Sequence, residues 1–171
     1  GYDKVADLAK RAGLNKKIKG YPSVALGAFE VTPLEMAGAY TMFANEGKLL
    51  QPHALNRVLA ADGSVLHTYK YPQTQVLSPQ VAFLMTRLME RVIKRGTGAS
   101  VISPGFNLPA AGKTGTSRDG WFAGYTKDYI VIAWVGFDDN TDLNMEGAHS
   151  ALPIWTDFML KAQQLYPPRD V

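Results

Sequence analysis

The residues best suited to chemistry lie together in the second half of the chain, at Lys113-Thr114-Gly115-Thr116. On an extended strand, Lys113 and Gly115 would share one face, and Thr114 and Thr116 would share the other. Gly115 would let another molecule approach the backbone, and a strand with a free edge can pair with an extended peptide. An amine, two hydroxyls and free backbone groups suit acyl transfer, whereas the alternative is a solvated edge strand with a protective lysine.

The segments around this stretch predict the sheet that would position it. Small residues and threonines before a turn, followed by two β-branched or aromatic runs split by Gly and Asp, predict three antiparallel strands at about residues 108–117, 120–126 and 129–137. Residues 55–70 predict a β-hairpin that could stand apart from this sheet. The fold class expected from these patterns is α+β, with helices packed on an antiparallel sheet.

Helices are predicted from apolar spacing and from capping residues. Thr32-Pro33-Leu34-Glu35 is a capping box that begins a helix, and Gly47 is placed to end it. Ser78 begins another helix, which runs to Gly96. Helical spacing also predicts two further helices, at residues 2–12 and near 150–166.

Composition weakens several classes of function. The chain has 171 residues, of which 46% are hydrophobic and 19% charged, as is ordinary for a globular domain with one core. Its net charge of +3 comes from scattered Lys and Arg, so nucleic-acid binding has little support. The most apolar run, residues 129–137, is too short to cross a bilayer, so any membrane anchor is expected outside this chain.

No metal or cofactor site is predicted. The three histidines, His53, His67 and His149, lack metal-ligand spacing. Residues 138–146 place oxygens at alternate positions, as a calcium loop does, but Leu143 stands where that loop needs Gly and His149 where it needs Glu. A loop rich in turns is therefore the preferred interpretation.

Several motifs together resemble a known family. Lys113-Thr114-Gly115-Thr116 resembles the K-T-G motif of the serine β-lactamase/transpeptidase-like superfamily. The neighbouring motifs, in the same order, resemble the transpeptidase domain of class A penicillin-binding proteins over nearly the whole chain. They lie at residues 25–47, 95–98 (Arg-Gly-Thr-Gly), 119–125 (Asp-Gly-Trp-Phe-Ala-Gly-Tyr), 134–138 and 151–155. The resemblance implies part of that superfamily's fold and places Gly96-Thr97-Gly98 near the floor of the active site, whereas the alternative for Thr97 itself is a flexible helix cap.

One departure from the family's pattern concerns the nucleophile. The family carries its nucleophilic serine in S-x-x-K and a second serine in S-x-N, and none of the seven serines here is followed by Lys at three or Asn at two. Residues 1–171 therefore resemble the C-terminal portion of one transpeptidase domain, without the portion that bears the nucleophile. The chain alone is expected to be inactive.

The resemblance implies a peptidoglycan D,D-transpeptidase on the periplasmic or extracellular face of the bacterial cytoplasmic membrane. A serine would take the acyl group from a stem peptide, an amine of a second stem peptide would resolve the acyl-enzyme, and β-lactams would trap the serine. By motif position, Lys113 would hydrogen-bond the S-x-N serine and help to move protons. Thr114 and Thr116 would bind the substrate carboxylate beside Gly115, and the Thr116 N–H would donate to the oxyanion. The charged and neutral forms of Lys113 both stay open.

The same resemblance predicts how the chain would associate. In the family, the last strand, at residues 129–137 here, pairs with a strand from the N-terminal half of the domain. The chain alone is therefore expected to expose an apolar strand edge. It would pair through that edge with the missing half or with itself.

The K-T-G motif leaves several rival functions open. A D,D-carboxypeptidase or a β-lactamase would share the K-T-G motif and differ in whether water or an amine resolves the acyl-enzyme. A non-catalytic binding module could keep the same fold. A phosphate-binding loop at Gly112-Lys113-Thr114 is rejected, because Asn107 stands where that loop needs Gly and the stretch leads into strands without a helix.

Overall fold

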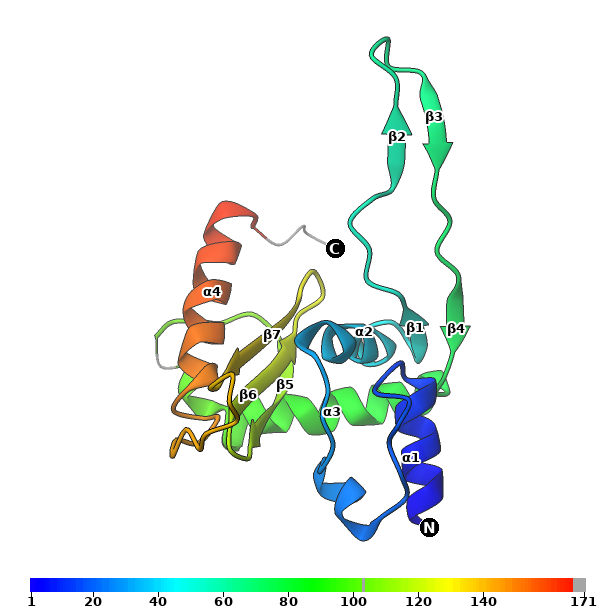
Figure 1. Ribbon diagram of the computed structural model, residues 1–171. Helices are drawn as coiled ribbons and strands as arrows, with labels where there is room; N and C mark the ends of the chain where they lie inside the picture. Colours follow the sequence, from blue (N-terminus) through cyan, green and yellow to red (C-terminus); the bar gives the residue numbers. More distant parts are fainter. Residues whose placement is uncertain (103, 168–171) are drawn as a thin grey trace.

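A three-stranded antiparallel sheet lies at the centre of the α+β fold (Figure 1). The computed structural model describes residues 1–102 and 104–167. The sheet has the strand order β5-β6-β7, which confirms the three predicted strands with somewhat shorter bounds. These strands are β5 (Ala111–Thr116), β6 (Gly120–Tyr125) and β7 (Ile130–Val135).

Helices cover both faces of this sheet. Helix α4 packs on one face, against β6 and β7, while α2 packs on β7 and α3 on β5 from the other side. The four α-helices of the described residues are α1 (Tyr2–Arg11), α2 (Pro33–Ala44), α3 (Pro79–Arg95) and α4 (Ala151–Leu165). Each corresponds to a predicted helix, and no helix within residues 1–102 and 104–167 has the length and apolar character needed to cross a membrane.

Local capping explains where two of these helices begin. At α2, the Thr32 N–H donates to a Glu35 carboxylate oxygen at 2.7 Å, and the Glu35 N–H donates to the Thr32 hydroxyl at 3.1 Å. At α3, the Val81 N–H donates to the Ser78 hydroxyl at 3.3 Å. Both capping predictions are therefore confirmed, because the groups that satisfy the free helical N–H lie within one turn.

Two local predictions need correction. Helix α2 ends at Ala44 with Asn45 as its C-cap, so Gly47 lies beyond the cap position. Gly47 still closes the helix end with a positive φ of 86°, donating its N–H to the Met42 carbonyl at 2.7 Å. The lysines and the Gly20-Tyr21-Pro22-Ser23 stretch within residues 15–31 predict a loop, but the structure has a 3₁₀ helix at Pro22–Leu26, where proline fixes the first φ angle.

The main hydrophobic core lies between α4 and the sheet. Trp155 and Phe122 are fully buried, with ring centroids 5.0 Å apart, and the indole N–H of Trp155 donates to the Val131 carbonyl at 3.1 Å. Gly124 on β6 leaves the space that the indole fills, since a Cβ there would lie 2.8 Å from the Trp155 ring. This packing fixes the sheet against α4.

A long two-stranded arm projects away from the sheet (Figure 1). Its outer part is the predicted hairpin, in which β2 (Arg57–Leu59) pairs with β3 (Val65–Thr68). Its inner part is a second ladder between β1 (Lys48–Leu50) and β4 (Gln73–Gln75), which the sequence did not predict. The hairpin prediction is confirmed, including its separation from the main sheet.

Candidate active site

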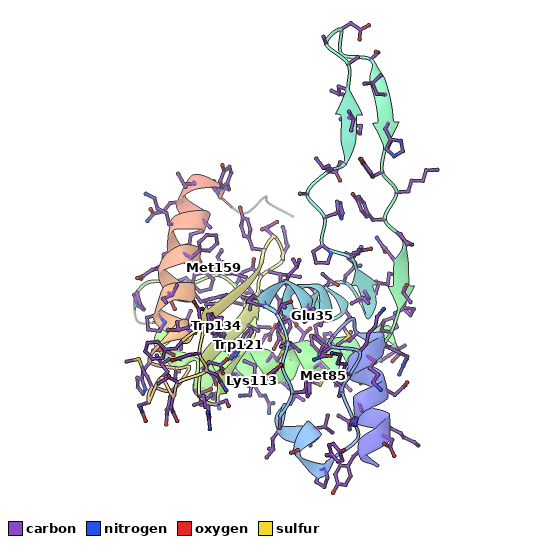
Figure 2. All side chains as sticks on the ribbon, viewed as in Figure 1. Glu35, Met85, Lys113, Trp121, Trp134 and Met159 are labelled. Carbon is purple, nitrogen blue, oxygen red and sulfur yellow. The ribbon has the colours of Figure 1, made fainter. Side chains whose placement is uncertain are left out.

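Strand β5 carries all four predicted site residues at the border of the sheet. It pairs with β6, with Lys113 opposite Ala123 and Gly115 opposite Trp121, and it is the first strand in the order β5-β6-β7. The side chains of Lys113 and Thr116 are exposed, and Thr114 is half-buried. The predicted residues are thus extended and accessible, and Lys113 lies on the same sheet face as Trp121 and Trp134 (Figure 2).

The ladder register shows which backbone groups of β5 are free. The Thr126 N–H donates to the Tyr129 carbonyl at 2.9 Å, so this pair forms a hydrogen-bonded position between β6 and β7. Because such positions alternate along antiparallel strands, Ala123 directs its backbone toward β5, opposite Lys113. The backbone N–H and C=O of Thr114 and Thr116 therefore face the free edge.

The ammonium of Lys113 lies against this free edge. Its Nζ donates to the Thr114 carbonyl at 2.8 Å and lies 3.4 Å from the Thr114 hydroxyl. The lysine side chain therefore turns back along its own strand. Its positive charge stands beside the backbone groups that an extended ligand would use.

The hydroxyl of Thr114 meets a second threonine from another element. Its oxygen lies 2.7 Å from that of Thr97, which follows the C-terminus of α3. Helix α3 packs on β5, and this packing brings together residues that are 17 positions apart. Thr97 therefore lies beside the predicted site residue Thr114.

The hydroxyl of Thr116 is held from the opposite end of the site. It accepts a hydrogen bond from the Gly147 N–H at 3.0 Å, across 31 positions of sequence. Gly147 lies so close to the sheet that a Cβ there would clash with the carbonyl oxygens of Gly115 and Trp121. Sequence reasoning missed this residue, because a glycine in a polar loop carries no local sign of a long-range contact.

The polar loop between β7 and α4 consists of turns closed by aspartates. Asp139 accepts from the Thr141 N–H at 3.0 Å, and Asp142 accepts from the Asn144 N–H at 2.8 Å. Hydrogen bonds from Thr141 hold the pKa of the Asp139 carboxyl below its ordinary value. These bonds favour the interpretation as turns, and within the described part of the chain no group of three or more His, Cys, Asp or Glu is arranged to hold a metal ion.

Two tyrosines, Tyr125 and Tyr40, lie where the sheet packs against α2 and α3. The Tyr125 hydroxyl on β6 lies 2.7 Å from the Thr86 hydroxyl on α3, and its ring packs edge-on against Tyr40 of α2 at 6.3 Å. Burial, together with the neighbouring Tyr125, raises the pKa of Tyr40 to about 12. Burial also raises the pKa of Tyr125. Both phenols are therefore neutral near pH 7, and they link the sheet to α2 and α3.

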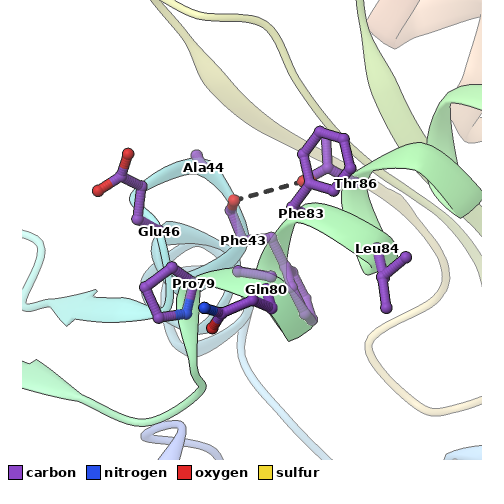
Figure 3. A pocket seen from close by; sticks show the side chains of 9 residues that line it. Phe43, Ala44, Glu46, Pro79, Gln80, Phe83, Leu84 and Thr86 are labelled. Carbon is purple, nitrogen blue, oxygen red and sulfur yellow. Dashed lines mark hydrogen bonds between the residues drawn. The ribbon is translucent and has the colours of Figure 1, made fainter.

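A groove elsewhere on the surface does not include the predicted residues. It has a volume of about 610 Å³ and lies between the end of α2 and the start of α3 (Figure 3). Phe43 and Phe83 contribute to its apolar walls, and the Thr86 hydroxyl donates to the Phe43 carbonyl at 3.4 Å within it. None of the four predicted site residues lines this groove, so the candidate site stays on β5.

Comparison with known proteins matches the chain to penicillin-binding proteins. Residues 1–160 match the family model described as the penicillin binding protein transpeptidase domain. The chain is 34% identical to penicillin-binding protein 1A of Aquifex aeolicus over 99% of its length, and 37% identical to penicillin-binding protein 1B of Escherichia coli over 88%. These alignments span 24% and 19% of the two relatives, so the chain corresponds to about a quarter or less of their length.

Solved structures resemble the fold as well. The crystal structure of penicillin-binding protein 1A from Haemophilus influenzae superposes with a TM-score of 0.87 at 27% identity, covering 100% of this chain and 32% of that one. The structure of PonA1 from Mycobacterium tuberculosis in complex with penicillin V gives a TM-score of 0.78 at 25% identity, covering 100% of this chain and 52% of that one.

Proposed function

Because the chain belongs to the penicillin-binding protein transpeptidase domain family, we propose that it supplies the substrate-binding edge strand of a bacterial peptidoglycan D,D-transpeptidase. One observation carries this proposal. Strand β5 presents the Lys113 amine, two threonine hydroxyls and the outward backbone groups of Thr114 and Thr116 along one open border. An extended stem peptide can pair with such a border.

Lys113 is proposed to act in proton transfer and in binding the substrate carboxylate. Its ammonium already contacts the free edge, at 2.8 Å from the Thr114 carbonyl. In the proposed site, this flexible side chain turns from the Thr114 carbonyl to a serine hydroxyl supplied from outside these residues. A cation at that position also attracts the terminal carboxylate of an acyl donor.

Thr116 is proposed to contribute one oxyanion donor. Its backbone N–H faces the free edge, as the ladder alternation requires, while its side chain is held by Gly147. A preorganised N–H of this kind stabilises the transition state by about 2.7–4 kcal/mol as a tetrahedral oxyanion forms. The hydroxyls of Thr114 and Thr116, with Gly115 between them, would bind the substrate carboxylate.

The nucleophile is proposed to come from polypeptide outside these 171 residues. No serine here stands in S-x-x-K or S-x-N, so acylation needs another portion of the same domain, and residues 1–171 act as the C-terminal portion. The proposal includes a serine acyl-enzyme on the periplasmic or extracellular face of the cytoplasmic membrane, which cross-links stem peptides and is trapped by β-lactams. The penicillin V complex of PonA1 supports the β-lactam part of the proposal.

Mass spectrometry after incubation with a penicillin tests the proposal. The chain alone should carry no adduct, whereas the longer protein that contains it should gain one penicillin on a serine outside the chain. In the longer protein, Lys113→Ala should abolish this adduct, while Lys70→Ala on the exposed arm should not. A stable adduct on the isolated chain, or normal acylation of the Lys113→Ala protein, would refute the assignment.

A further inference from the structure

The turn after α3 holds one hydroxyl at a defined place beside the candidate site. The N–H groups of Gly96 and Gly98 both donate to the Val92 carbonyl, at 3.0 and 3.1 Å. A Cβ at Gly96 would lie 2.9 Å from the Val92 Cα, so a larger residue there would displace the turn. Thr97, between these glycines, is therefore fixed by its backbone even though its side chain is exposed.

The Thr114 hydroxyl oxygen is approached from two directions. Thr97 Oγ1 lies 2.7 Å from it, and Lys113 Nζ lies 3.4 Å from it. A hydroxyl has one proton to donate and two lone pairs to accept with, while an ammonium can only donate. Either hydroxyl can be the donor in the Thr97–Thr114 contact, and when Thr97 donates, the proton of Thr114 is free to turn to a third partner.

We propose that Thr97 is a positioning residue that makes Thr114 a hydrogen-bond donor to the carboxylate of the acyl donor. The inference rests on the proposed function, because it requires that carboxylate to bind at the free edge of β5. Thr97 does not itself contact the substrate. It acts through Thr114, so the hydroxyl at position 97 matters more than the shape of the side chain.

Acylation kinetics of the longer protein with a penicillin separate binding from chemistry. Thr97→Val keeps the shape but removes the hydroxyl, and it should raise the dissociation constant of the non-covalent penicillin complex on the order of tenfold. The limiting acylation rate should stay within about threefold, because the reacting atoms are not touched. Thr97→Ser, which restores the hydroxyl, should bind penicillin within about twofold of the unsubstituted protein.

A penicillin whose carboxylate is esterified distinguishes positioning from a purely structural role. Thr97→Val should raise the dissociation constant of the ester less than that of the acid, since the neutral ester carbonyl is a weaker hydrogen-bond acceptor for Thr114 than a carboxylate. Thr68→Val, the same substitution on the projecting arm, should change neither ligand's affinity. Equal losses for acid and ester, or a serine variant as weak as the valine variant, would overturn the inference.

The outcome also distinguishes this inference from the function on which it rests. If the unsubstituted longer protein is acylated and Thr97→Val binds penicillin normally, the role of Thr97 alone is wrong. If penicillin does not acylate the unsubstituted protein at all, the proposed function is wrong, and this inference, which rests on it, is wrong too.

Discussion

The backbone N–H of Gly147 donates a hydrogen bond of 3.0 Å to the side-chain oxygen of Thr116. This bond joins the loop before α4 to the last residue of β5. It forms only because Gly147 has no side chain, since a Cβ would clash with carbonyl oxygens of β5 and β6. The orientation of the Thr116 hydroxyl thus depends on the backbone N–H of a residue that has no side chain.

Gly147→Ala should therefore destabilise the chain. Forcing a methyl group between these carbonyl oxygens should cost about 1–3 kcal/mol of unfolding free energy, as overpacking does. Denaturant-induced unfolding of the isolated chain measures the loss. Gly1→Ala is the control, because nothing lies within 4 Å of a Cβ at that position. Equal unfolding midpoints for both variants would show that the loop moves away without cost.

Trp155→Ala should have the largest effect among substitutions on α4. The side chain is fully buried, contacts Phe106 and Phe122 edge-on, and donates to the Val131 carbonyl. Its loss should cost about 3–5 kcal/mol of unfolding free energy. Phe158→Ala on the same helix, where the side chain is 56% exposed, should cost about 0.5 kcal/mol or less. Similar losses at the two positions, measured by denaturant unfolding, would contradict this description of the core.

Alkaline pH should weaken the fold through Tyr40. Its pKa is about 12 in the folded state and near 10 when unfolded, so between these values the folded state holds more protons. The free energy of unfolding therefore falls as pH rises from 10 to 12, by at most about 2–3 kcal/mol. Below pH 10, Tyr40 should not make the free energy of unfolding depend on pH. Unfolding curves of the chain and of Tyr40→Phe should diverge in slope only above pH 10, and parallel slopes throughout would refute the effect.

The outer edge of β7 should promote self-association of the isolated chain. Backbone groups alternate in direction along β7 as they do along β5, so the N–H and C=O of Ile132 point away from β6. Ile132→Pro removes a donor from that edge without removing a ladder bond, so it should block strand pairing between copies. Sedimentation at rising concentration should show association for the unsubstituted chain and for Ile132→Val, and less for the proline variant. A monomer at every concentration for the unsubstituted chain would contradict the prediction.

Features set within one turn of the chain could be predicted from sequence. The capping box at Thr32 and Glu35 and the cap at Ser78 follow from side chains that reach neighbouring N–H groups. The first central strand follows from small residues and threonines before a turn, and the other two follow from runs of β-branched and aromatic residues. These signals are local, so no knowledge of the rest of the molecule was needed.

Features that depend on distant partners could not be predicted. Strands β1 and β4 are three residues each, too short to show a period, and β4 is the wholly polar Gln-Thr-Gln. They form a ladder because the hairpin between them brings their ends together. In the site, the residue types on β5 were evident, whereas the contact of Thr116 with Gly147 arises only once α4 has packed on the sheet.

The two threonines of β5 are each tied to a different part of the chain. Thr114 meets the turn after α3, and Thr116 meets the loop before α4. The strand itself sets the spacing of these two residues, whereas the two contacts set the direction in which each hydroxyl turns. Under the proposed function, lengthening or shortening either connection by one residue, without altering β5, should change the angle at which the two hydroxyls meet the substrate carboxylate.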